Sequence, residues 1–380
     1  MKIVADENIP LLMECFGGIG QVVQRPGRSI TAEDLQGADA LLVRSVTQVN
    51  KPLLENSSLS FVGTCTAGLD HMDLDYLAER QIAAAHAPGC NATAVVEYVL
   101  AALDVLAERD GFDLQQRVVG VVGKGEVGGR LYRTLDRLGV EVYANDPLCP
   151  PDESVRFLEL DELIERCDVI CLHTPLTTSG LHPTRHLINE PRLSAMKPGT
   201  ILLNAGRGPV IDNGALKSVL LKGQPLSVVL DVWESEPNPD PELIPLVDIA
   251  TPHIAGYSLD AKISGTEMIY KAFCQHFGLP ARVRVGAVTP IPALKKLGFT
   301  DSVLIERARS VAIRSVYDIR RDDARMRPLA NMADRERSQA FDYLRKHYGE
   351  RREFKTLSVQ FNNTCQAVQK ELRAMGFNTM

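Results

Sequence analysis

Short apolar runs alternate with amphipathic stretches along the first two thirds of the chain, which is the pattern of an α/β protein. Continuous apolar runs are typical of parallel strands that are covered on both faces. The runs that predict strands are 2–5, 40–43, 61–64, 118–122, 141–145, 168–172, 200–203 and 227–230. Helical periodicity predicts helices between them, most plainly at 92–108, 127–138 and 212–222. We therefore expect an α/β fold with parallel sheets.

The last hundred residues show a different pattern, with helices that are apolar on one face only. One predicted helix has its apolar face at positions 303, 304, 308, 311, 312, 315 and 319. Further helices are expected at 341–348 and 367–375, with a strand at 357–361 between them. Such faces must be buried against the body of the chain or against a second subunit. The pattern predicts a C-terminal α+β module.

Length and charge modify this picture. A chain of 380 residues is too long for one ordinary core, so two or three domains are expected. The net charge of −6 hides an asymmetry, because residues 281–380 hold 20 Lys and Arg against 11 Asp and Glu, whereas the first 280 residues hold 22 against 37. A basic tail suggests nucleic acid, but its basic residues alternate with acids, as on solvated helix faces. We expect no nucleic-acid binding.

Membrane, secretory and metal-binding classes find little support in the sequence. The opening MKIVADENIP lacks the apolar stretch of a signal peptide. The most apolar helical run, 95–106, is interrupted by Glu97 and Asp104 and is too short to span a bilayer. The eight cysteines form no C-x-x-C pair, which favours reduced thiols and no metal site. We expect a cytoplasmic protein without membrane contact.

A glycine-rich loop directly follows the predicted strand at 118–122. Gly123, Gly125 and Gly128 have the spacing G-x-G-x-x-G, and a helix is predicted after them. In this setting the glycines permit a tight turn, a close approach of a pyrophosphate and close packing of the helix on the strand. Glycine triplets alone are weak evidence, since glycine is also simply a turn residue. The flanking strand and helix favour a dinucleotide site.

An acidic residue ends the next predicted strand. Asp146 follows Gly128 by 18 residues, where a carboxylate binds the adenosine ribose hydroxyls and repels a 2′-phosphate. This position favours NAD over NADP. The alternative is that Asp146, before Pro147, only forms an Asx turn. Lys124 and Glu126 are unusual inside such a loop, where small or apolar residues are expected.

Polar residues follow the other predicted strands, where the ligand crevice of an open α/β sheet lies. Arg44, Ser45 and Thr66 are candidate substrate contacts in the N-terminal part, although Ser and Thr also cap turns. Arg44 is the strongest of the three, because an arginine at a strand end can bind a carboxylate or phosphate through two hydrogen bonds.

Three later residues have the chemistry of a hydroxy-acid dehydrogenase. His253 is suited to accept a hydroxyl proton at neutral pH, and Glu236 could hold its ring in one tautomer. Arg207 could bind a substrate carboxylate, and its position between two glycines leaves its backbone free to take an unusual turn. Each also has a plainer interpretation as a loop histidine or a surface charge, and chain order does not prove that they meet.

The sequence blocks around these residues resemble the D-isomer-specific 2-hydroxyacid dehydrogenases. The blocks are GVVGKGEVGGRL, CLHTPLT, LLNAGRGPVID, DVWESEP and TPHIAGYS, and they fall within about the first 280 residues. The resemblance implies a Rossmann-type NAD domain at 92–254, inserted into a smaller flavodoxin-like α/β substrate domain at 1–91 and 255–283. The segment 284–380 would be an α+β dimerisation module, so the resemblance implies a homodimer.

The resemblance also implies roles for individual residues. The residue that matches Arg207 binds the substrate carboxylate, and the one that matches His253 is an acid/base held by Glu236. The cofactor contacts expected for NAD are Gly123, Gly125, Glu126, Val127, Gly128, Asp146, Thr174, Ala205, Gly206, Arg207, Asp231 and Gly256. Further blocks (KIVADENIP, VRSVT, GTCTAGLDHMD and HIAGYS) match members with a phosphorylated acid as substrate. They imply substrate contacts at Ser45, Thr66 and Tyr257, with Arg44 near the anionic end.

Three alternatives remain open at this point, and the least favoured is nucleic-acid binding by the basic tail. A sister dehydrogenase that oxidises another acid, such as 3-phosphoglycerate, would carry the same Arg/Glu/His set. A protein on this fold could also bind NAD only to sense it, although a pure sensor has no need of an acid–base pair.

Overall fold

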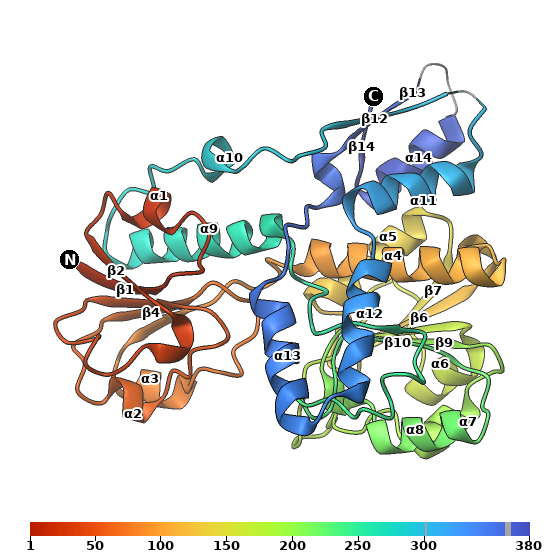
Figure 1. The fold of residues 1–380 in the computed structure, drawn as a ribbon, viewed down its shortest axis with the longest axis horizontal. Helices are drawn as coiled ribbons and strands as arrows, with labels where there is room; N and C mark the ends of the chain where they lie inside the picture. The colour runs from red at the N-terminus through yellow and green to blue at the C-terminus, as the bar shows by residue number, and fades with distance from the viewer. Residues whose placement is uncertain (301, 362–365) are drawn as a thin grey trace. The chain divides into compact units, whose positions relative to one another are not determined.

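The computed structural model describes residues 1–300, 302–361 and 366–380, and the chain divides into two compact units. The first unit comprises residues 1–92 and 257–293, and the second comprises residues 93–256 and 294–380 (Figure 1). No helix in the described residues is long and apolar enough to cross a membrane. Seven cysteines lie in these ranges; none of them is in a disulfide, and five are buried.

The first unit is built on a five-stranded parallel sheet. Its strands are β1 (Lys2–Asp6), β2 (Gln21–Arg25), β3 (Ala40–Val43), β4 (Phe61–Thr64) and β5 (Ala83–Ala85). Their order, β2-β1-β3-β4-β5, is that of flavodoxin-like folds, which confirms the predicted fold class for this unit. The helices are α1 (Leu12–Phe16), α2 (Lys51–Leu54), α3 (Leu74–Glu79), α9 (Leu259–His276) and α10 (Val285–Val288).

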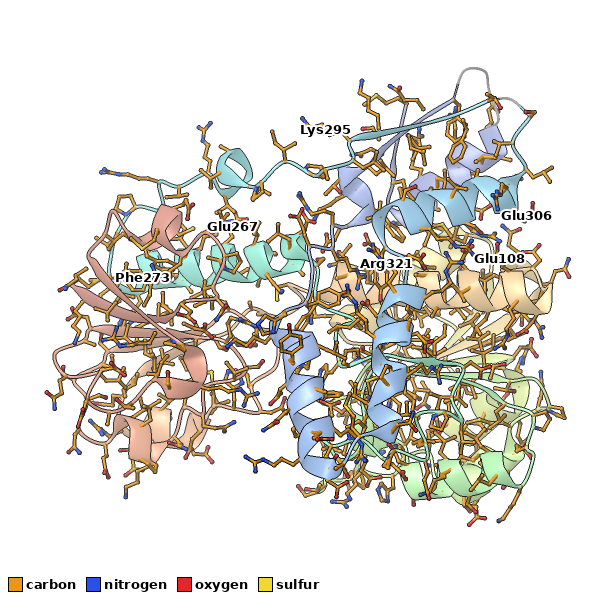
Figure 2. All side chains as sticks on the ribbon, in the orientation of Figure 1. Glu108, Glu267, Phe273, Lys295, Glu306 and Arg321 are labelled. Atoms are coloured by element: carbon orange, nitrogen blue, oxygen red, sulfur yellow. The ribbon has the colours of Figure 1, made fainter. Side chains whose placement is uncertain are left out.

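The strands of the first unit are buried on both faces, as their continuous apolar runs require. Ile3 and Ala5 pack in a core with α1 and α9, whereas Val4 between them packs in a core with α2 and α3. Figure 1 shows these helix pairs on opposite sides of the sheet. Phe273 and Glu267, both labelled in Figure 2, show the amphipathic division of α9: Phe273 is fully buried, and Glu267 forms an ion pair with Lys271 nearer the surface.

The second unit contains a six-stranded parallel sheet. Its strands are β6 (Val118–Val122), β7 (Glu141–Asn145), β8 (Val169–Leu172), β9 (Ile201–Asn204), β10 (Ser227–Leu230) and β11 (Ile249–Ala250). The order is β11-β10-β9-β8-β6-β7, so the direction of winding reverses between β6 and β8, and a ligand crevice is expected at such a point. The helices among them are α4 (Ala92–Asp110), α5 (Glu126–Arg137), α6 (Leu160–Arg166), α7 (Glu190–Ala195) and α8 (Asn213–Leu221).

The C-terminal extension packs on this second sheet and carries a small parallel sheet of its own. Its elements are β12 (Lys296–Phe299), α11 (Ile305–Val316), α12 (Arg320–Met326), α13 (Asp334–Lys346), β13 (Ser358–Phe361), α14 (Gln366–Met375) and β14 (Asn378–Thr379). Met326, Leu329 and Phe341 belong to the core of the second unit. At the far end of α4, Arg314 of α11 forms an ion pair with Glu108, which is labelled in Figure 2.

The predicted single helix through position 319 is wrong in one respect, because the structure breaks it. Helix α11 ends at Val316, and Tyr317 has the extended backbone angles φ −146° and ψ 114°. Its buried hydroxyl donates a hydrogen bond to Asp322 in α12 (3.0 Å). The turn therefore places an aromatic side chain in the interior, which continued helical geometry would direct elsewhere.

Candidate active site

The carboxyl ends of the second unit's strands bring the predicted polar segments to one edge. The last residues of β7, β6, β8, β9 and β10 lie level across the sheet. The residues that directly follow these strands are Gly123, Asp146, His173, Ala205 and Asp231. The expected gathering of loops from successive strands is therefore confirmed.

The glycine loop has the backbone that a dinucleotide site requires. Gly123 has φ +89°, which favours glycine. A Cβ at Gly128 would lie 1.8 Å from the Gly123 carbonyl oxygen, so only glycine fits where α5 packs on the loop. At Gly125, which caps α5, a Cβ would meet no atom within 4 Å. This open position lies at a helix N-terminus, whose first N–H groups attract anions.

Asp146 is held against this loop. Its Oδ2 accepts a hydrogen bond from the Lys124 N–H (2.8 Å), and its Oδ1 accepts one from the Leu148 N–H (3.1 Å). The second bond is the Asx turn considered as an alternative, so the structural role is present together with a position suited to the ribose. Glu126 is exposed, and the Lys124 ammonium lies 3.3 Å from Asp152.

Two polar side chains after β8 have buried atoms without a partner. Within the described residues, neither ring nitrogen of His173 nor the Thr174 hydroxyl has a hydrogen-bond partner. Burial lowers the pKa of His173 to about 4, so its ring is neutral at physiological pH. A bound polar ligand would satisfy such groups. With the glycine loop and Asp146, the unsatisfied Thr174 hydroxyl fits a bound dinucleotide, and Thr174 was among the expected contacts.

Arg207 is positioned by the loop after β9. The Asn204 side chain donates to the Arg207 carbonyl (3.0 Å) and accepts from the Gly206 N–H (3.0 Å). The Arg207 backbone takes no unusual turn, although its flanking glycines would permit one, and is extended (φ −133°, ψ 136°). The neighbouring Gly208 is required for close packing, because a Cβ there would lie 1.9 Å from the Trp233 carbonyl oxygen.

The structure brings Glu236 and His253 into direct contact. The Glu236 Oε2 lies 2.6 Å from His253 Nδ1, and its Oε1 accepts the Trp233 N–H (2.9 Å). Burial acts to raise the pKa of Glu236, but the adjoining His253 and the Trp233 N–H outweigh it and keep this pKa below its usual value. The carboxylate is therefore ionised at neutral pH. Since it occupies Nδ1, it leaves Nε2 of His253 for a substrate.

The loop that carries His253 is tied to the end of β10. His253 itself has φ +56°, an uncommon angle for a residue with a side chain. The Asp231 carboxylate accepts hydrogen bonds from the N–H groups of Ile254 (2.8 Å) and Ala255 (2.9 Å), and the Asp231 carbonyl accepts the His253 N–H (2.7 Å). Asp231, expected at the cofactor, therefore also shapes the loop before Gly256.

The expected substrate contacts lie at strand ends of the first unit. Arg44 and Ser45 follow β3, and Thr66 lies just beyond β4. The Thr66 hydroxyl lies 2.7 Å from the Thr64 hydroxyl, which in turn lies 2.9 Å from His71 Nε2. Tyr257 immediately precedes Ser258, the N-cap of α9. These placements do not test the assigned roles, which stay predictions.

The sequence analysis missed one cation in the first unit. Lys262 lies in the first turn of α9, with its ammonium 4.8 Å from the centre of the Tyr257 ring. A lysine on an amphipathic helix is usually a surface residue, and its spacing of five from Tyr257 was the only available signal. Lys262 differs from a surface lysine in being partly buried, and the apolar periodicity of the helix did not predict this burial.

One group of side chains has the composition of a metal site. In the described residues, His186, Asp212 and Glu234 have potential ligand atoms within 4.8 Å of one another. These side chains are already hydrogen-bonded without a metal: His186 Nε2 lies 2.6 Å from Glu234, Glu234 accepts the Asn213 N–H (3.1 Å), and Asp212 caps α8 through the Ala215 N–H (2.9 Å). We assign the group no metal.

Comparison with known proteins bears on this geometry. Residues 100–255 match the family model "D-isomer specific 2-hydroxyacid dehydrogenase, NAD binding domain", and residues 288–376 match a domain of unknown function, DUF3410. The erythronate-4-phosphate dehydrogenase of Ectopseudomonas mendocina is 51% identical over the full length of both chains. That of Hahella chejuensis is 47% identical over 378 residues, which are 100% of this chain and 99% of its own. The chain belongs to the erythronate-4-phosphate dehydrogenase family.

A solved structure agrees with this membership. D-Lactate dehydrogenase from Aquifex aeolicus, complexed with NAD and lactic acid, is 25% identical and has a TM-score of 0.61. It matches 73% of this chain and 96% of its own length, so about a quarter of this chain lies outside the fold that the two share. The prediction of a Rossmann-type NAD domain in an NAD-dependent oxidoreductase is confirmed.

Proposed function

We propose that this chain oxidises 4-phospho-D-erythronate at C2 to 2-oxo-3-hydroxy-4-phosphobutanoate with NAD⁺, as a step of pyridoxine biosynthesis. The observation that carries the proposal is the 2.6 Å contact between His253 and Glu236 at the crevice edge of an NAD-binding domain. Full-length relatives named erythronate-4-phosphate dehydrogenase support this substrate over 3-phosphoglycerate.

The proposed mechanism assigns one task to each residue of the set. His253 accepts the C2 hydroxyl proton at Nε2, because Nδ1 faces Glu236. The Glu236 carboxylate then stabilises the imidazolium and holds the ring in place. Arg207 binds the substrate carboxylate through its planar guanidinium. When bound, NAD⁺ supplies the hydride acceptor. An enzyme that uses this pair for proton transfer is favoured over a protein that only senses NAD.

The expected homodimer also stays a proposal, which exposed apolar side chains in the segment 284–380 support. Val288, Ile291, Leu294 and Leu304 are exposed, Ile291 and Leu304 by about 70%. Exposed apolar residues close together in sequence suit a subunit interface better than contact with water. We expect Ile291→Asp with Leu304→Asp to yield monomers in sedimentation experiments, whereas Leu181→Asp, at a fully exposed loop position, should leave the dimer intact.

The direct test is formation of reduced nicotinamide from a panel of phosphorylated 2-hydroxy acids. We expect turnover with 4-phospho-D-erythronate, and His253→Ala should reduce kcat by about 10²–10⁴-fold, the usual contribution of general acid–base catalysis. His186→Gln is the matched control, because His186 also contacts a carboxylate but lies outside the set. Near-normal turnover in His253→Ala would refute the mechanism, and no turnover with any acid would favour the sensor.

A further inference from the structure

Arg44 and Lys262 are partly buried cationic side chains of the first unit. In the described part of the chain, neither Arg44 nor Lys262 forms an ion pair, and the only partner of the Lys262 ammonium is the Tyr257 ring. Of the acids on α9, Glu267 is paired with Lys271 (2.6 Å), and Asp260 also has an interaction of its own. Partly buried cations are normally paired, so this arrangement points to an anion supplied from outside the chain.

Two glycines bring Lys262 to the strand ends. A Cβ at Gly63 in β4 would lie 2.6 Å from the Ile269 side chain, and a Cβ at Gly265 would lie 2.5 Å from the Cys65 carbonyl oxygen. Helix α9 therefore lies directly on β4 and on the first residue after it. Lys262 precedes Gly265 by three residues, about one helical turn, so it lies beside this contact.

The same register places Arg44 at this edge. Thr64 of β4 is level with Val43 of β3, so Cys65 and Arg44 follow neighbouring strands at the same height. Arg44 on the sheet and Lys262 on helix α9 therefore both lie at the carboxyl ends of β3 and β4. Their charges interact, since the charge of Arg44 lowers the pKa of Lys262 in addition to the larger effect of burial.

The local helix adds to the attraction for an anion. Helix α9 has 18 residues, and its N-cap Ser258 accepts the Ala261 N–H through its hydroxyl (2.9 Å). The positive end of the helix dipole is therefore at the turn that carries Lys262. A phosphate monoester carries close to two negative charges at neutral pH, whereas a carboxylate carries one.

We infer that Lys262 and Arg44 form the subsite for the phosphate group of the substrate, with the Tyr257 ring against the lysine ammonium. This inference rests on the proposed function, and it assigns the choice between phosphorylated and unphosphorylated acids to Lys262. Two cations match the charge of a phosphate dianion.

The test compares 4-phospho-D-erythronate with D-erythronate, which retains the carboxylate and lacks the phosphate. Lys262→Met should raise KM for the phosphorylated acid by about 10–100-fold, the effect of losing one charge-assisted hydrogen bond. Its kcat should change little, and kcat/KM for D-erythronate should change less than threefold. Lys262→Arg should restore most of the affinity. Lys271→Met removes an exposed lysine of the same helix and should behave as the wild type.

An equal loss of kcat/KM with both acids, or no loss with either, would overturn the subsite. Failure of the proposed function would look different, because the wild-type chain would then form no reduced nicotinamide. In that case, calorimetric titration would still measure the affinity of the chain for 4-phospho-D-erythronate. Weaker binding by Lys262→Met than by Lys271→Met would support the subsite, and equal binding would refute it.

Discussion

The acid–base pair of the second unit and the cationic pair of the first unit differ in whether their charges are paired within the protein. Glu236 and His253 contact each other, and hydrogen bonds from the surrounding backbone fix both. Arg44 and Lys262 form no ion pair among the described residues. A catalytic group must keep one geometry through the reaction, whereas a binding group must leave its charge available. The contrast separates groups that perform chemistry from groups that select the substrate.

The C-terminal extension contributes to the fixed geometry of the first of these sites. Arg351 is almost fully buried, and its guanidinium donates to the carbonyls of Ala255 (3.0 Å) and Ala94 (2.6 Å). It stacks on the Tyr317 ring at 3.7 Å. Since Asp231 binds the N–H of Ala255 from the other side, the loop after His253 is held at both its N–H and its carbonyl. Arg351 is thus a positioning residue for the acid–base pair.

The largest effect expected from the extension follows from removing this contact. Arg351→Met should lower kcat by about 10–100-fold, because small displacements of a catalytic group cost up to about two orders of magnitude. Binding of ADP-ribose, which lacks the nicotinamide, should be unchanged. Arg351→Lys should recover part of kcat, because it can still donate to one carbonyl.

Arg309→Met is the matched control for the stability of the fold. Arg309 is also a mostly buried arginine of the extension, and it bonds Asp104 of α4 (3.2 Å) without contacting the His253 loop. Both methionine variants should lower the free energy of unfolding, by roughly 1.5–3 kcal/mol for each charge-assisted hydrogen bond lost. If kcat fell equally in the two variants, Arg351 would support the fold alone.

The sequence predicted the central parts of both units well and their margins poorly. The fully buried strands β1, β3, β4 and β8 to β10 were all anticipated, because a continuous apolar run reports burial on both faces. Strands β2, β5, β11, β12 and β14 were missed. All are edge strands of their sheets, and β2 is largely exposed, so its residues QVVQR show no such run.

The two sites differ in the same way. The residues of the acid–base pair were named from motifs, since a histidine and a carboxylate with this chemistry are recognisable in the chain. Lys262 was not recognised, because its importance depends on the close approach that Gly63 and Gly265 permit. The support from Arg351, about a hundred residues after His253, depends likewise on tertiary packing that periodicity does not reveal.

The smallest expected effect is a pH dependence that only the cationic pair should show. Burial, helped by the charge of Arg44, lowers the pKa of Lys262 to about 8. As the pH rises from 7 to 9, Lys262 loses its proton, whereas Arg44 stays charged and the substrate phosphate, whose second pKa is about 6, stays doubly ionised. Affinity for the phosphate should therefore fall, so kcat/KM for 4-phospho-D-erythronate should decrease by up to about tenfold at pH 9.

Two comparisons assign this decrease to Lys262. Lys262→Arg keeps its charge throughout the range, so its kcat/KM should not decrease between pH 7 and 9. D-Erythronate places no phosphate at the subsite, so the wild type should show no such decrease with it. A decrease that persisted in Lys262→Arg, or that appeared equally with D-erythronate, would belong to the acid–base pair or to the cofactor site. Such a result would refute the claim that the charge of Lys262 is kept available for the substrate phosphate.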